Sequence, residues 1–149
     1  MHSDTTRYAL IMLLAGIGIP ILAALNSQLG ARIGAPVAAS VVLFTVALLA
    51  CVLVLVFSGQ ASAFDPMPAQ PKHLFAAGLF VAFYVLSITF VAPRFGVGNA
   101  VFCVLLGQMI AATLIDQFGL FGAAVHTVTV TRAAGLLAMV GGLALIQRG

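Results

Sequence analysis

Long apolar runs without charged residues, separated by short polar breaks, dominate the chain. The runs cover about residues 8–29, 36–57, 74–92, 97–116 and 131–146. A helix rises about 1.5 Å per residue and the hydrocarbon core of a bilayer is about 30 Å thick, so one span needs roughly 20 apolar residues. The pattern therefore predicts an all-α integral membrane protein, a single domain of five transmembrane helices.

The breaks between the runs carry turn-forming residues. Segment 58–72, SGQASAFDPMPAQPK, contains three prolines and small polar residues, which is typical of a loop. In the segment PRFG, Pro93 disfavours helical geometry at Ala92, while Gly96 and Gly98 permit a turn. We therefore expect a tight hairpin there between the third and fourth spans.

The fifth run is shorter than the other four. It follows Arg132, and the segment FGLFGAAVHTV before it has the composition of a loop or an interfacial stretch. Thr129 or Thr131 is expected to cap its first turn.

Composition narrows the class of protein. The 149 residues are 63% hydrophobic and 6% charged, and the net charge of +3 comes from scattered single residues. Nucleic-acid binding needs clustered Lys and Arg, so no nucleic-acid partner is expected. The chain has no metal-ligand spacing, activated nucleophile pair or phosphate loop, so we expect neither enzymatic activity nor a cofactor or metal.

The basic residues divide evenly between the two sides of the five predicted spans. Orientation in the bilayer follows the excess of Lys and Arg in cytoplasmic loops, and this chain has none. One interpretation is a weak bias settled by details of insertion. The other is dual topology, in which copies insert both ways and pair as an antiparallel homodimer, the geometry of the inverted repeats of secondary transporters. Arg7, Lys72 and Arg132 lie on one side, and Arg32, Arg94 and Arg148 on the other.

Four polar side chains within or beside the runs are candidates for a substrate pathway. Polar groups inside a bilayer are costly unless paired, so they serve either a ligand or a neighbouring helix. Gln108 and Tyr84 lie near the middle of their runs, and Asn26 lies near the end of the first. Asn99 opens the fourth run and can instead be a helix cap.

Two further residues are candidates for coupling or gating. Asp116 adjoins the end of the fourth run, where it can couple to protons or form an interfacial ion pair with Arg132. Pro20 removes one helical hydrogen bond and crowds the carbonyl of Gly16, which predicts a kink. Such a kink can be a hinge or a static packing feature.

Four stretches together resemble the YdcZ-like family of bacterial inner-membrane proteins in the drug/metabolite transporter superfamily: ILAALNSQLGARIGAP, FYVLSITFVAPRFGVGNAV, LLGQMIAATLIDQFGLFG and the glycine-rich last helix. The resemblance implies a five-helix unit that occurs as one dual-topology protein, as oppositely oriented pairs or as fused ten-helix proteins. It implies a transport role, and the LNxxLG and DQFGLFG patterns draw attention to Asn26 and Asp116.

The related small multidrug resistance proteins rely on a mid-membrane Glu in their first helix, whereas this chain contains no Glu at all. A neutral or weakly polar metabolite therefore suits this chain better than a cationic drug exchanged for protons. We expect a multi-pass transporter of the bacterial inner membrane, surrounded by the lipid bilayer. It would work by alternating access at a polar midplane cavity between two antiparallel copies. The alternatives are a dual-topology passive channel and a non-transporting membrane scaffold.

Overall fold

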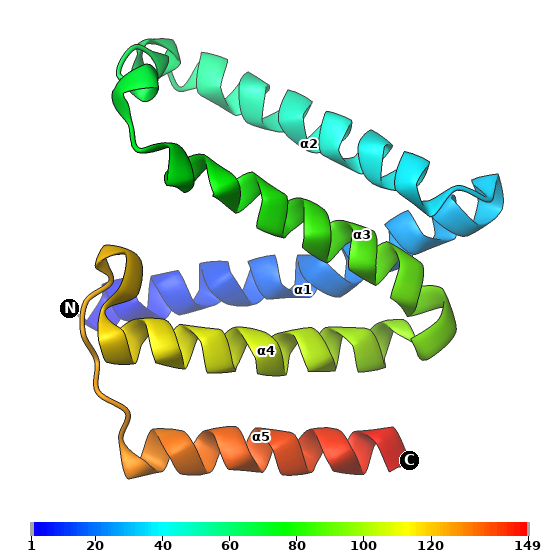
Figure 1. Ribbon diagram of the computed structural model, residues 1–149, viewed down its shortest axis with the longest axis vertical. Helices are drawn as coiled ribbons and strands as arrows, with labels where there is room; N and C mark the ends of the chain where they lie inside the picture. Colours follow the sequence, from blue (N-terminus) through cyan, green and yellow to red (C-terminus); the bar gives the residue numbers. More distant parts are fainter. Residues whose placement is uncertain (1, 149) are drawn as a thin grey trace. The chain divides into compact units, whose positions relative to one another are not determined.

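The protein is an all-helical chain with five helices long and apolar enough to cross a membrane (Figure 1). The computed structural model describes residues 2–148, with the side chains of residues 2–4 and 61 outside that description. Five transmembrane helices are thus confirmed at the level of fold. The helices are α1 (His2–Ile33), α2 (Pro36–Phe57), α3 (Ala77–Phe95), α4 (Val97–Phe118) and α5 (Val130–Arg148).

Helix α1 is longer than the expected span of residues 8–29. Its 32 residues correspond to about 48 Å, more than the thickness of the hydrocarbon core. The helix ends where Gly34 adopts a positive φ of 67°, a conformation that favours glycine. Helical geometry continues beyond the apolar run because Arg32 is tolerated in the last turn, where a positive charge interacts favourably with the helix dipole.

The break between α3 and α4 differs from the expectation. Helix α3 continues through Ala92 and Pro93 to Phe95, so the predicted loss of helical geometry at Ala92 is wrong. Proline disfavours helix in the preceding residue without forbidding it, and any distortion at Pro93 affects little of the helix because only Arg94 and Phe95 follow it in α3. Gly96 is the only residue between the two helices, with φ 90° and ψ 138°. Gly98 lies inside α4.

The loop predicted after α2 is present and contains three short 3₁₀ helices. They cover Ala61–Phe64, Met67–Ala69 and Lys72–Ala76, the last leading directly into α3. At the other end of α2, Pro36 occupies the first helical position, where its missing N–H costs nothing.

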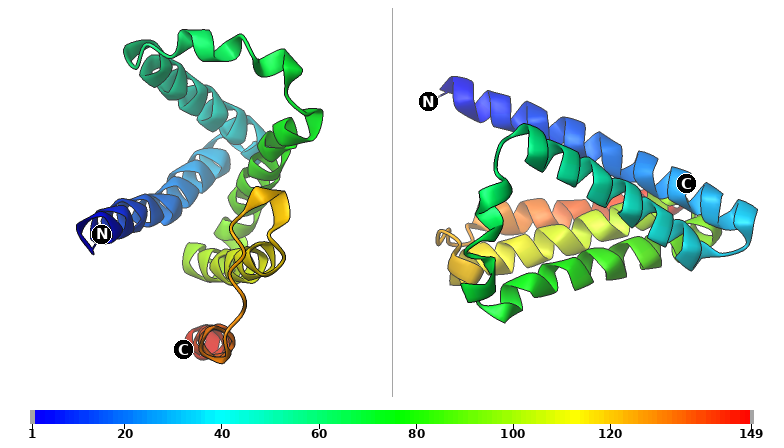
Figure 2. Two further views of the ribbon diagram at one scale, coloured as in Figure 1. Left: turned by 90° about the vertical axis from the view of Figure 1, so that its left-hand side faces the viewer. Right: turned by 90° about the horizontal axis from the view of Figure 1, so that it is seen from above.

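The chain divides into two compact units, one up to Phe95 and one from Gly96 on. The first contains α1, α2 and α3, which all contact one another, and the second contains α4 and α5 (Figure 2). A single five-helix domain stays a prediction.

In the first unit, the buried residues gather near the turn that joins α1 and α2. Figure 1 shows these two helices meeting at the turn and separating away from it. The first half of α1, from Thr5 to Gly18, is consequently exposed. The buried residues are Ala23, Asn26, Ser27, Gly30, Ala39, Ser40, Val85, Ile88, Thr89 and Ala92. Four of these ten carry polar side chains, so the core of this unit is small and partly polar.

In the second unit, a structured connection joins α4 to α5. Gly119 ends α4 in the left-handed conformation, at φ 59° and ψ 33°. Thr129 Oγ1 accepts a hydrogen bond from the N–H of Arg132 at 3.2 Å, so the expected threonine cap of α5 is confirmed at Thr129. Within the described part of the chain, no residue of α5 is buried.

Candidate functional site

Three polar side chains from three helices meet at the core of the first unit. We call this cluster of Asn26, Ser40 and Thr89 the polar knot. The Asn26 Nδ2 of α1 donates to the Thr89 Oγ1 of α3 at 2.6 Å and lies 3.4 Å from the Ser40 Oγ of α2. All three residues are at least 95% buried. The knot therefore links the three helices through one side-chain amide.

The hydroxyl groups of the knot determine which way the amide points. Thr89 donates its hydroxyl hydrogen to the carbonyl oxygen of Val85 at 2.7 Å, and Ser40 donates its own to Pro36 at 3.1 Å. Both hydroxyl oxygens are then left only as acceptors. The Asn26 group that faces them must be the NH₂, so the carbonyl oxygen Oδ1 points away from the knot.

A glycine allows the helices to approach closely beside the knot. A Cβ atom on Gly30 would lie 3.0 Å from Pro36 Cα, 3.4 Å from Thr89 Cγ2 and 3.6 Å from Ala39 Cβ. The first of these distances is too short for a comfortable contact with backbone. The LNSQLGARIGAP stretch thus combines the amide of the knot, a close contact at Gly30, a left-handed turn at Gly34 and a helix start at Pro36.

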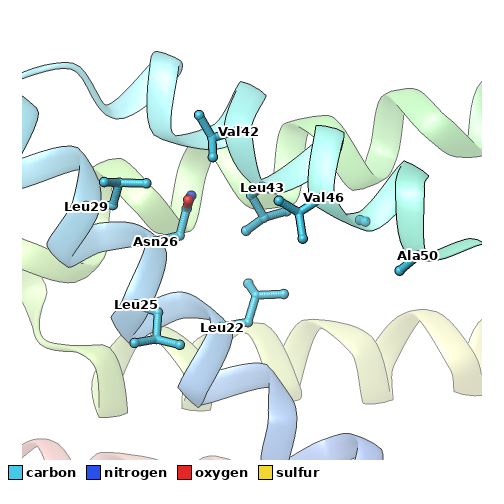
Figure 3. A pocket seen from close by; sticks show the side chains of 9 residues that line it. Leu22, Leu25, Asn26, Leu29, Val42, Leu43, Val46 and Ala50 are labelled. Carbon is cyan, nitrogen blue, oxygen red and sulfur yellow. The ribbon is translucent and has the colours of Figure 1, made fainter.

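A groove of about 430 Å³ runs between α1 and α2, next to the knot (Figure 3). Its nine lining residues are apolar except for Asn26. Figure 3 shows Asn26 projecting from α1 toward α2, with the amide oxygen in front of the nitrogen. The apolar walls include Leu22, Leu25 and Leu29 of α1 and Val42, Leu43 and Val46 of α2.

A second hollow, of about 420 Å³, lies on the turn side of the knot. Gly30, Gly34, Thr89 and Arg94 are among its lining residues. The Arg94 side chain folds back on α3: its Nη1 donates to the carbonyl oxygen of Phe90 at 2.6 Å, and its guanidinium carbon lies 4.0 Å from the centroid of the Phe90 ring. Arg94 is therefore held at the end of α3 by its own helix.

The other two candidates in the first unit have different surroundings. The hydroxyl of Tyr84 is buried and has no hydrogen-bond partner among the described residues. Pro20 lies inside α1, which continues without interruption on both sides of it. Neither residue belongs to the polar knot, and their roles stay predictions.

In the second unit, Asp116 forms the ion pair that the sequence suggested. Its Oδ2 accepts from Arg132 Nη2 at 2.6 Å, and both side chains are about one-third exposed. The carbonyl oxygen of Asp116 accepts from the N–H of His126 at 2.9 Å, and Gln117 Oε1 accepts from the N–H of Val128 at 2.6 Å. The DQFGLFG stretch thus anchors the connection to α5. A coupling role for Asp116 stays a prediction.

Gln108 and Asn99 both lie on α4. Gln108 is exposed, and within the described part of the chain its side chain makes no hydrogen bond. Asn99 is the third residue of α4 and not its cap, because Gly96 occupies the capping position. The expectation of an Asn99 cap is wrong, since α4 begins directly after Gly96.

Sequence reasoning missed Ser40 and Thr89. A hydroxyl inside a membrane helix usually bonds to its own backbone four residues earlier, and both residues do so. The available signal was an asparagine in one span together with hydroxyl residues in two other spans, because an amide NH₂ has two hydrogens to donate. Only the packing of the helices selects these two hydroxyls from the others.

This arrangement defines a class of protein: a helical protein that crosses the membrane several times and buries polar side chains between its spans. Residues 7–145 match the family described as "Putative inner membrane exporter, YdcZ". The chain belongs to this family, which confirms the resemblance, and it is a multi-pass protein of the inner membrane. Neither the curated proteins nor the solved structures compared with the chain give a match.

Proposed function

We propose that this protein exports a small, uncharged metabolite as a pair of antiparallel copies, by alternating access at a polar cavity near the membrane midplane. The family's description as an exporter supports the transport role. The observation that carries the paired mechanism is the even division of basic residues between the two ends of the spans.

The basic residues lie at or near the ends of the candidate spans. Arg7 is close to the start of the first span, while Lys72 and Arg132 lie at the starts of the third and fifth. The other three basic residues lie at span ends: Arg32, Arg94 and Arg148. Because orientation depends on an excess of Lys and Arg on one side, an even count favours insertion in both directions.

The surface of the described helices supports association with further protein. Gln108 places an exposed amide in an apolar span, where a polar group without a partner is costly. Its own unit does not supply that partner. A second copy that faces Gln108 would provide a polar cavity of the kind that transporters use near the midplane.

The polar knot supports a mechanism in which packed helices move as bodies. Alternating access in transporters is largely the rocking of one rigid repeat against another. The knot and the close contact at Gly30 hold α1, α2 and α3 together at one end. We infer that the first unit moves as one such body.

Topology and pairing can be tested with two oppositely locked variants. Thr5→Lys with Thr6→Lys adds positive charge at the start of α1, and Ile33→Lys with Gln147→Lys adds it on the other side. Differently tagged forms of each are co-expressed and purified through one tag. We expect each variant to pair with the opposite variant and not with itself.

The matched controls are Thr5→Gln with Thr6→Gln, and Ile33→Gln alone because position 147 is already Gln; both add polarity without charge and should leave self-pairing unchanged. A wild-type protein whose copies all place the amino terminus on one side of the membrane would contradict antiparallel pairing. So would a locked variant that pairs with itself as well as the wild type does.

Transport is tested separately in proteoliposomes, with a metabolite that raises the unfolding temperature of the purified protein. An alternating-access exporter gives saturable flux and counterflow. Conduction without counterflow would identify a channel, and the absence of flux would identify a scaffold. Gln108→Ala is expected to abolish flux while the assembly stays intact, and loss of assembly would show that Gln108 serves packing instead.

A further inference from the structure

Asn26 is the one polar residue that lines the α1–α2 groove. The NH₂ of this amide is used by Thr89 and Ser40, whose hydrogens are committed to backbone carbonyls. Oδ1 therefore cannot turn toward the knot without losing both bonds. No described residue donates a hydrogen bond to it, although Asn26 is only 4% exposed.

The position of this oxygen makes an unfilled acceptor costly. Asn26 lies seven residues before Ile33, the last residue of α1, which corresponds to about 10 Å along the helix. The groove beside it is thus inside the apolar layer, where little water is available to complete hydrogen bonds. A lipid acyl chain can fill the groove, but it has no donor to offer.

We propose that the α1–α2 groove is a binding site for an uncharged, largely apolar molecule that carries one hydrogen-bond donor, an O–H or N–H group, which bonds to Asn26 Oδ1. The volume of about 430 Å³ falls in the range of small-molecule sites, roughly 300–1,000 Å³. Apolar walls with a single polar contact that fixes orientation are typical of such sites.

The orientation of the amide also selects the charge of the ligand. An anion would face the negative end of the carbonyl dipole, and no basic residue lines the groove. A cation would lose its hydration with no carboxylate there to compensate. A neutral donor meets neither penalty. Because Thr89 and Ser40 set this orientation, they are positioning residues for the site.

A role for this site in export rests on the proposed function, whereas binding of a ligand to the site can be measured without transport. The test uses purified full-length protein in detergent micelles and four probes with one ring system: β-naphthol, its methyl ether, β-naphthoate and β-naphthylmethylammonium. Equilibrium dialysis against empty micelles separates binding to the protein from partitioning. We expect saturable binding of β-naphthol, roughly fivefold tighter than binding of the methyl ether, the effect of one neutral hydrogen bond.

Two substitutions on α2 locate the site. Val46 lines the groove, whereas Leu48 does not, and both are more than 60% exposed, so a larger side chain should not disturb the fold at either position. Val46→Phe fills the groove and should abolish the preference for β-naphthol. Leu48→Phe is the matched control and should bind as the wild type does.

Equal binding of β-naphthol and its methyl ether would overturn the proposal, because the groove would then be a plain apolar surface. Tighter binding of either charged probe would overturn it too. If Val46→Phe leaves binding unchanged, the site lies elsewhere. If Val46→Phe instead separates the protein into monomers and no probe binds, a second copy occupies the groove. If the probes bind as expected but proteoliposomes show no flux, the proposed export function is refuted and the proposed binding site stands.

Discussion

The hydrogen bonds of the polar knot lead us to predict an unusual order of the free energies of unfolding among its variants. Asn26→Leu removes both interhelical hydrogen bonds, yet the hydroxyls of Ser40 and Thr89 keep their bonds to backbone carbonyls. The reverse change, Ser40→Ala together with Thr89→Val, leaves the amide NH₂ buried without an acceptor. Removing the acceptors should therefore cost more than removing the donor.

The magnitudes follow from the distances. Hydrogen bonds between membrane helices contribute about 0.6 kcal/mol on average and up to about 1.7 kcal/mol. The bond from Asn26 to Thr89 is short, at 2.6 Å, and the one to Ser40 is long, at 3.4 Å. We expect Asn26→Leu to lower the free energy of unfolding by about 1–2 kcal/mol. The double variant leaves a buried donor group unsatisfied, and we expect it to cost about 2–4 kcal/mol.

The triple variant provides the decisive comparison. Adding Asn26→Leu to the double variant removes the unsatisfied NH₂, so it should restore about 1 kcal/mol or more. The free energies of unfolding would be measured by SDS titration of the protein in mixed micelles, followed by circular dichroism. A triple variant that is no more stable than the double variant would refute the cost assigned to the unsatisfied amide.

Three further predictions concern packing and the connection before α5, each measured in the same unfolding assay. Gly30→Ala should lower the free energy of unfolding by about 1–3 kcal/mol, because its Cβ would lie 3.0 Å from Pro36 Cα; an unchanged value would contradict the close approach. Phe121 has φ 57° and is 88% exposed, so Phe121→Gly should raise stability by about 1 kcal/mol, and a loss of stability would mean that the ring makes contacts important to the fold. Asp116→Asn should change stability by less than about 1 kcal/mol, since the pair with Arg132 is about one-third exposed; a larger loss would indicate a desolvated pair.

Much of the architecture was predictable because a bilayer constrains length and polarity strongly. The five spans, the loop after α2 and the cap at Thr129 follow from apolar run lengths and from local turn and cap chemistry. Helix ends were less predictable. Arg32 and Pro93 resemble boundaries in the sequence, but a helix can extend past the hydrocarbon layer and can include a proline near its end.

The candidate site was predictable only in part. Asn26 was identified as a polar residue in an apolar span, and Asp116 was expected to pair with Arg132, which it does. Ser40 and Thr89 gave no comparable signal, because a hydroxyl can satisfy itself on its own helix. Gln108 and Tyr84 were identified by the same rule as Asn26, yet neither makes a side-chain hydrogen bond among the described residues.

The amino-acid sequence by itself determined that this chain crosses the membrane as helices, about where the spans lie and that three basic residues lie near span starts and three at span ends. Apolar length and charge position act locally along the chain, so they can be read without knowing which helices touch. The tertiary structure decided which polar groups meet. A hydrogen bond depends on a few tenths of an ångström and on the direction of its donor, and only the packing of α1, α2 and α3 brings the Asn26 amide to two hydroxyls.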